Sequence, residues 1–212
     1  MEEKERKVII GATEVFMKLG IKSVNMDDVS RSLGISKKTL YQYVKDKNEL
    51  VRKAMQLHCE IEDIAMDAIC AKGLNAIDES FEMMKFISDM LRLIHPSIMF
   101  DIEKYHPEIK GEMLENRQNR IFICIYENLN KGIEEGFYRS DLNPRITARL
   151  YVGLVELIFK PEHFKDEQLN IFELYLEMFR YHIRGIASEK GIQYLQQKVK
   201  EERTKQDQSK QQ

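Results

Sequence analysis

The sequence predicts an all-helical protein with a small N-terminal head and a larger helical body, joined by one long helix. Apolar residues recur at spacings of three and four along most of the 212 residues, as they do on amphipathic helices. Glycine and proline are few, and strand-like runs are short. A chain that is 43% hydrophobic and 32% charged can bury a core and stay in solution.

The first two helices of the head are marked by their ends. The first is predicted over residues 3–19, where an apolar stripe repeats with helical spacing and Gly20 follows. Asn25 is a good N-cap for the second helix, and Asp28 stands where a carboxylate completes a capping box. Gly34 suits the left-handed position just past the end of that helix.

Two further helix starts follow closely. Ser36 is expected to cap a short third helix, and Asp46 with Glu49 is expected to form the capping box of a fourth helix, from Lys47 to about Ala71. Two short helices joined by a glycine-containing turn form a helix-turn-helix, which lays its second helix in the DNA major groove. The fourth helix is longer than the head, so it must run into the body.

The body is expected to be helical throughout. Helices are predicted over residues 75–94, 97–104, 108–135, 143–159 and 168–187, with a polar connection at 160–167 and a weakly amphipathic piece near 192–199. These patterns divide the chain into a helix-turn-helix head (1–46), a helical body (47–203) and a low-complexity tail predicted to be disordered (204–212).

Charge is distributed unevenly along the chain. Its net value is −2, yet residues 1–58 hold 12 of the 33 Lys and Arg and 8 of the 35 Asp and Glu, a local net of +4. The rest of the chain therefore carries −6. This asymmetry suits a head that meets nucleic acid and an acidic body.

One segment carries a specific resemblance. The stretch GISKKTLYQYVKDKNEL, residues 34–50, resembles the DNA-binding signature of TetR-family regulators. The matching positions are Gly34, Ser36, Thr39, Leu40, Tyr41, Tyr43, Lys47 and Leu50, preceded by Ala12, Phe16, Gly20, Ile21, Met26, Val29, Ser30 and Leu33. Lys38 and Val44 depart from the common pattern, where many members have a small residue and Phe. The strong match covers about the first quarter of the chain.

The resemblance implies a homodimeric cytoplasmic transcriptional regulator of the repressor type, which a small apolar or amphipathic ligand releases from a palindromic DNA operator. Lys37, Lys38, Tyr41 and Tyr43 are then candidates for base contacts, with Gln42 on the same surface. Ser36, Thr39 and Lys47 are candidates for phosphate contacts.

Two candidate sites are expected in the body. The last two major helices are apolar over wide faces, and the resemblance implies that they pair with a second copy through Tyr151, Leu154, Val155, Ile158, Tyr175 and Phe179. Met and aromatic residues suit an adaptable ligand pocket, and the candidates are Met84, Phe86, Met90, Phe100, Tyr105, Phe122 and Tyr126.

Catalytic, metal and membrane roles are not expected. The three cysteines Cys59, Cys70 and Cys124 lack metal-ligand spacing, and Glu103-x-x-His106 is one motif where a di-metal bundle site needs two. The sequence shows no catalytic triad, no phosphate-binding glycine loop and no long apolar run. The alternatives to a DNA-binding regulator are a helical protein-interaction module and, less favoured, a helical-bundle enzyme.

Overall fold

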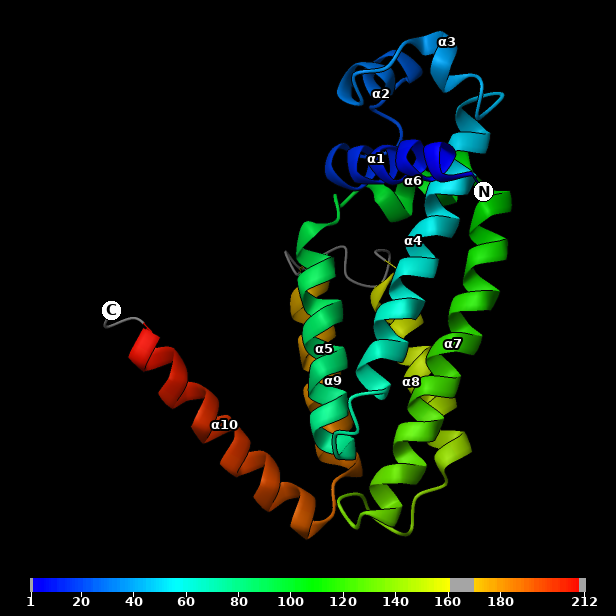
Figure 1. Ribbon diagram of the computed structural model, residues 1–212. Coiled ribbons are helices and arrows are strands. Elements are labelled where there is room, and N and C mark those ends of the chain that lie inside the picture. The colour runs from blue at the N-terminus through cyan, green and yellow to red at the C-terminus, as the bar shows by residue number, and fades with distance from the viewer. Residues whose placement is uncertain (1, 161–169, 210–212) are drawn as a thin grey trace. The chain divides into compact units, whose positions relative to one another are not determined.

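A computed structural model describes residues 2–160 and 170–209 of the chain (Figure 1). The prediction of an all-helical fold is confirmed. The elements are α1 (Glu3–Leu19), α2 (Met26–Ser32), α3 (Lys37–Leu40), α4 (Lys47–Cys70), α5 (Ala76–Leu93), α6 (Ile98–Tyr105), α7 (Pro107–Glu134), α8 (Pro144–Ile158), α9 (Ile171–Ile186) and α10 (Glu189–Ser209). One isolated antiparallel bridge joins Tyr138 and Ala187.

The chain forms two compact units, and neither is continuous in sequence. The first contains residues 1–68 and 89–120, and the second contains residues 69–88 and 121–212. Helices α4, α5 and α7 each contribute to both units. The grouping differs from a division at residue 46, because α6 and the first half of α7 share a core with α1–α4.

The core of the first unit joins the head helices to α6 and α7. Phe16, Leu40 and Leu50 are completely buried, and Ile102 of α6 and Ile109 of α7 belong to the same cluster. Burying an aliphatic or aromatic side chain of this size stabilises a fold by about 1.5–3 kcal/mol. The three head helices are therefore held on a base made from later parts of the chain.

The predicted caps of the head are present. The Asn25 carboxamide oxygen accepts from the N–H groups of Asp27 and Asp28, at 2.9 and 3.0 Å, and the Asp28 carboxylate accepts from Asn25 N at 3.0 Å. Ser36 Oγ accepts from the backbone of the third helix, and Gly34 takes the left-handed φ of 64°. These local bonds fix where α2 ends and α3 begins.

The cap of α4 differs in one detail from the expected capping box. Asp46 Oδ1 accepts from Glu49 N at 2.8 Å, as predicted. Glu49 Oε2, however, accepts from Lys45 N at 2.8 Å, one residue before the cap. Both bonds satisfy backbone donors at the start of α4, so the helix begins where the sequence places it.

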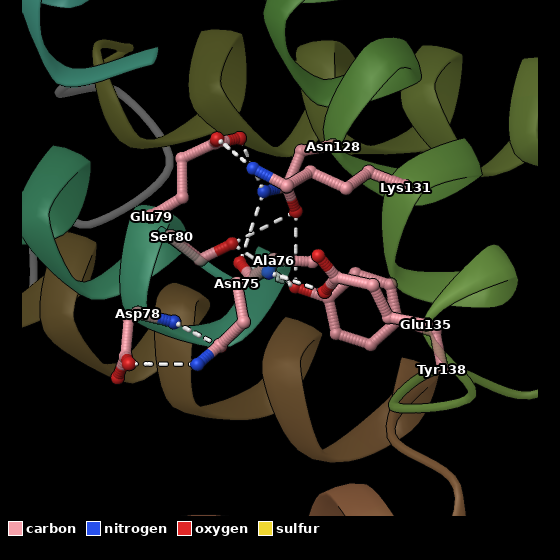
Figure 2. A network of polar contacts seen from close by, with 9 residues as sticks. All are labelled: Asn75, Ala76, Asp78, Glu79, Ser80, Asn128, Lys131, Glu135 and Tyr138. Atoms are coloured by element: carbon pink, nitrogen blue, oxygen red, sulfur yellow. Dashed lines mark hydrogen bonds and ion pairs between the residues drawn. The ribbon is translucent and has the colours of Figure 1, made fainter. Parts of the chain in front are cut away.

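A buried polar network organises the second unit (Figure 2). Glu79 of α5 is 5% exposed, and its carboxylate accepts from Lys131 Nζ at 2.7 Å and from Asn128 Nδ2 at 2.8 Å. The Asn128 carboxamide oxygen accepts from Ser80 Oγ and from the Tyr138 hydroxyl, both at 2.9 Å. The network ties α5 to α7 and to the loop that follows α7.

The C-terminal helix is longer than the amphipathic piece predicted near residues 192–199. Helix α10 is continuous to Ser209, and Figure 1 shows it running away from the other helices of its unit. Asp78 anchors its first half, because its carboxylate oxygens each lie 2.6 Å from a donor, the Tyr194 hydroxyl and Lys198 Nζ. Glu, Lys, Gln and Arg dominate the remainder, and these residues favour helix without needing a core. The predicted connection at residues 160–167 falls almost wholly outside the described residues.

Candidate nucleic-acid interface

Helices α2 and α3 pack against each other as a helix-turn-helix (Figure 1). Val29, Leu40 and Val44 are buried between them and the rest of the head. The regular helix α3 ends at Leu40, and the chain continues in tight turns in which the N–H groups of Gln42 and Tyr43 bond the carbonyls three residues back. The second half of the predicted recognition surface therefore lies on a turn.

Three side chains of this segment point to solvent. Lys38 and Gln42 are exposed, and Tyr41 is 44% exposed. None of them contributes to the buried cluster of the head. Their exposure beside a buried Leu40 leaves one face of the segment free for a partner.

Lys37 is engaged within the head. Its Nζ lies 2.9 Å from an Asp27 carboxylate oxygen of α2, and this bond raises the pKa of Lys37. The pair is exposed, so it is worth little in stability. It holds the Lys37 side chain toward α2, and a phosphate or base edge would compete with Asp27 for the ammonium group.

Ser36, Thr39 and Tyr43 have local structural roles. Ser36 Oγ accepts from Thr39 N at 3.0 Å, and the two hydroxyl oxygens are 2.8 Å apart. Tyr43 is half-buried, and its carbonyl oxygen accepts from Lys53 Nζ at 2.9 Å. Of these three, Ser36 remains exposed at the start of α3.

Lys47 lies at the start of α4 and is half-buried. Its Nζ is 3.5 Å from the carbonyl oxygen of Lys22, in the turn between α1 and α2. Burial lowers the pKa of Lys47. The ammonium group is thus held at the junction of the first turn of α4 with the turn that precedes α2.

A residue of α6 that the sequence did not single out supports the same turn. Asp101 is 3% exposed, and its Oδ2 accepts from Ile21 N at 3.0 Å, from Lys22 N at 2.9 Å and from Ser97 Oγ at 3.0 Å. A nearby backbone bond joins the segment before α6 to α1, from His95 N to the Met17 carbonyl oxygen at 2.7 Å. No local pattern reveals the contacts with Ile21 and Lys22, because about eighty residues separate them from Asp101.

The candidate pocket residues fall in both compact units. Met90, Phe100 and Tyr105 belong to the first unit, and Met84, Phe86, Phe122 and Tyr126 belong to the second. Phe122 stacks on Tyr126 with ring centres 5.7 Å apart, and the Arg149 guanidinium lies 4.1 Å from the Phe122 ring centre. Phe100 and Tyr105 are 51% and 37% exposed. Neither unit gathers all seven residues.

The candidate dimer residues lie mostly inside the chain. Helix α8 packs on α9, and the buried residues are Tyr151, Val155, Ile158, Tyr175 and Phe179, while Leu154 is half-buried. The Tyr151 ring meets the His182 ring at 4.6 Å, and Phe179 meets Phe81 at 5.3 Å. The large apolar side chains that these two helices leave exposed are Ile146, Leu150, Leu157 and Tyr181.

The Glu103-x-x-His106 motif does not bring its side chains together on a metal. Glu103 pairs with Lys110 at 2.6 Å, and His106 is buried. In the part of the chain that the structure describes, no group of three His, Cys, Asp or Glu side chains is placed to hold a metal ion. None of the described helices is long and apolar enough to span a membrane.

A packed three-helix head with an exposed, partly basic second helix of its helix-turn-helix defines a DNA-binding protein of the helix-turn-helix class. Residues 8–54 match the family model for bacterial regulatory proteins of the TetR family. The match covers the three-helix head and supports a transcriptional regulator of the TetR type.

Relatives extend the similarity beyond the head. The HTH-type transcriptional regulator YvaF of Bacillus subtilis is 23% identical over 79% of this chain and 87% of its own length. The HTH-type transcriptional regulator SrpR of Pseudomonas putida is also 23% identical, over 84% of each chain.

Solved structures share the fold. A transcriptional regulator from Cytophaga hutchinsonii, 18% identical, superposes with a TM-score of 0.70 over 88% of this chain and all of the other. A regulator from Saccharomonospora viridis in complex with choline, 14% identical, superposes with a TM-score of 0.65 over 89% of this chain and all of the other.

Proposed function

We propose that this regulator is a homodimeric repressor that binds a palindromic operator and leaves it when a small molecule binds the body. The observation that carries the DNA-binding part is the outward face of α3 and its following turn. Lys38, Tyr41 and Gln42 are exposed there, while Leu40 between them is buried. A segment held this way can enter the major groove without losing its own packing.

Selection of DNA from a random library by the purified protein tests this proposal. Enrichment of a sequence with two-fold symmetry is expected, with half-sites about one helical turn apart. A library that returns no enriched sequence would favour a helical module whose partner is a protein.

The residues of the interface are expected to divide between base reading and phosphate contact. Gln42→Ala changes no charge, so it should cost about 1–3 kcal/mol on the selected site and leave the salt dependence unchanged. Lys47→Ala should weaken binding to all DNA and reduce the slope of log K against log salt by about one unit. Titrations of selected and scrambled DNA over a range of salt measure both effects. Equal losses on both DNAs for both variants would contradict this division.

The dimer is proposed to form through the exposed apolar stripe of α8. Ile146, Leu150 and Leu157 are 58%, 64% and 39% exposed, and Gly153 completes the 4-3-4 spacing of a helix seam. A Cβ on Gly153 would meet no atom within 4 Å, so the glycine leaves room for a partner helix. Tyr181 of α9 is 76% exposed and extends the apolar surface. Grouped exposed side chains of this size indicate a protein contact.

Leu150→Glu is therefore expected to give a monomer. The substitution would place an unpaired charge in the middle of the interface, at a cost of several kcal/mol. Sedimentation at micromolar concentration and circular dichroism should show a monomer with unchanged helix content. Leu93→Glu is the matched control, since Leu93 of α5 is 78% exposed and lies outside the stripe. A Leu150→Glu protein that stays dimeric would place the interface elsewhere.

A ligand is proposed to act on the separation of the two heads. Helix α4 begins in the head and contributes to both compact units, so a ligand that prefers one position of α4 changes the population of DNA-competent dimers. The structure of the same fold that contains choline supports a small organic molecule as the ligand class. Compounds found by thermal-shift screening should weaken operator binding, by a coupling of about 1–3 kcal/mol. Ligands that bind without changing operator affinity would contradict this part.

A further inference from the structure

We propose that Lys22, in the turn between α1 and α2, is an additional phosphate contact of the operator complex, and that α6 holds it in position. The inference rests on the proposed DNA binding and extends the interface beyond α3. It also gives α6 a direct effect on the DNA-binding surface, separate from any movement of α4.

The backbone at Lys22 is fixed by α6. Asp101 Oδ2 accepts from the N–H groups of both Ile21 and Lys22, and a third bond from Ser97 Oγ completes the environment of this oxygen. Because Asp101 is 3% exposed, these bonds are shielded from water and loss of the carboxylate leaves buried donors unpaired. The turn is therefore held to α6 at the residue that carries the cation.

The Lys22 side chain also rests on α6. Its Nζ lies 5.1 Å from the centre of the Tyr105 ring, and Lys104 Nζ lies 5.5 Å from the same centre. The contact with Lys22 lowers the pKa of the Tyr105 hydroxyl and raises the pKa of the Lys22 ammonium group. Among the described residues, neither lysine forms an ion pair with a carboxylate, so two exposed cations share one aromatic ring.

The position of Lys22 matches the expected path of a DNA strand. Lys22 precedes the N-cap of α2 by three residues, and Lys47 Nζ at the start of α4 lies 3.5 Å from the Lys22 carbonyl oxygen. In a helix-turn-helix complex the first helix of the motif crosses the sugar-phosphate backbone. Helix N-termini and nearby cations are the groups that bind phosphate. Lys22 and Lys47 thus present two cations near the N-termini of two helices.

The test compares Lys22→Ala with wild type on the selected operator and on random DNA. One phosphate contact contributes about 0.9 to the slope of log K against log salt. The ratio of the wild-type affinity to the Lys22→Ala affinity should therefore fall about threefold when salt is raised from roughly 50 to 200 mM. The loss should be the same on both DNAs. Lys22→Arg should keep the wild-type slope, and Lys18→Ala is the matched control, an exposed lysine in the last turn of α1.

Asp101→Ala tests the support from α6, because it removes the oxygen that accepts from the N–H groups of Ile21 and Lys22. It should reproduce the reduced salt slope of Lys22→Ala although Lys22 is still present, and the two substitutions combined should lose no more slope than either alone. Thermal unfolding of each variant shows whether the head stays folded, and the surface variant Lys22→Ala gives the result even where Asp101→Ala does not fold. A Lys22→Ala protein with the wild-type slope overturns the inference while leaving DNA binding intact. A wild-type protein that prefers no DNA sequence overturns the proposed function instead.

Discussion

Replacing Lys131 with methionine is expected to lower the free energy of unfolding by about 3–5 kcal/mol, because it leaves a buried carboxylate without its counter-charge. The Glu79 side chain is 6% exposed, and Lys131 Nζ lies 2.7 Å from its Oε2. After the substitution, Asn128 would be the one side-chain donor that still contacts the Glu79 carboxylate among the described residues (Figure 2). Chemical denaturation followed by circular dichroism measures the change.

Two further variants decide whether the buried charge is the cause. Glu79→Gln combined with Lys131→Met removes both charges and keeps a side-chain oxygen for Asn128, so it should recover most of the lost stability. Lys7→Met breaks an ion pair of similar length, 2.8 Å, whose side chains are 73% and 83% exposed. That control should cost less than about 1 kcal/mol. If the Lys131→Met variant is as stable as the Lys7→Met control, the ion pair with Lys131 does not contribute to the stability of the buried Glu79 carboxylate.

The head was predictable from sequence because its determinants are local. The caps at Asn25, Ser36 and Asp46 use side chains within three residues of the backbone groups they satisfy. Helix boundaries in the body were also close to those predicted, since apolar spacing and Pro144 mark them directly. The spacing of apolar residues shows which segments are helical, and this is enough to define the fold class.

Partners of apolar faces were not predictable in the same way. The pattern of α8 marks Tyr151 and Leu150 alike as apolar, yet the first is buried against α9 and the second is 64% exposed. Which residue lies in the chain's own core depends on how α8 is rotated against α9, and a single sequence does not contain that angle. The candidate dimer surface therefore had to be taken from the structure.

Long-range polar contacts were equally hidden. Asp101 lies in a short helix, IMFDIEKY, whose sequence pattern does not distinguish it from an acidic residue on the surface. Its role follows from the packing of α6 beside the turn before α2, which brings together groups about eighty residues apart. The proposed support of Lys22 depends on this contact, and no motif search would have found it.

The stability of the protein is expected to fall in mild acid because of His182. Burial lowers the pKa of His182 from 6.5 to about 4 in the folded chain. The unfolded chain binds this proton near the ordinary value, so between pH 6.5 and about 4 unfolding takes up a proton that the folded chain does not hold. His182 therefore leaves the free energy of unfolding unchanged above pH 6.5 and lowers it as the pH falls from 6.5 to about 4.

The expected loss from His182 alone is about 3 kcal/mol, because each unit of pKa shift corresponds to about 1.4 kcal/mol. His182→Phe removes the titrating group and keeps an aromatic ring against Tyr151, whose ring centre is 4.6 Å away. The variant should have the same free energy of unfolding as wild type near neutral pH and a higher one below about pH 4.5. Because both proteins are compared at the same pH, the contributions of the other titrating groups cancel in the difference. Denaturation curves at several pH values measure the difference, and an NMR titration of the imidazole gives the pKa independently. A variant and a wild type that lose stability in parallel would show that His182 titrates normally in the folded chain, and hence that the α8–α9 contact is open to water.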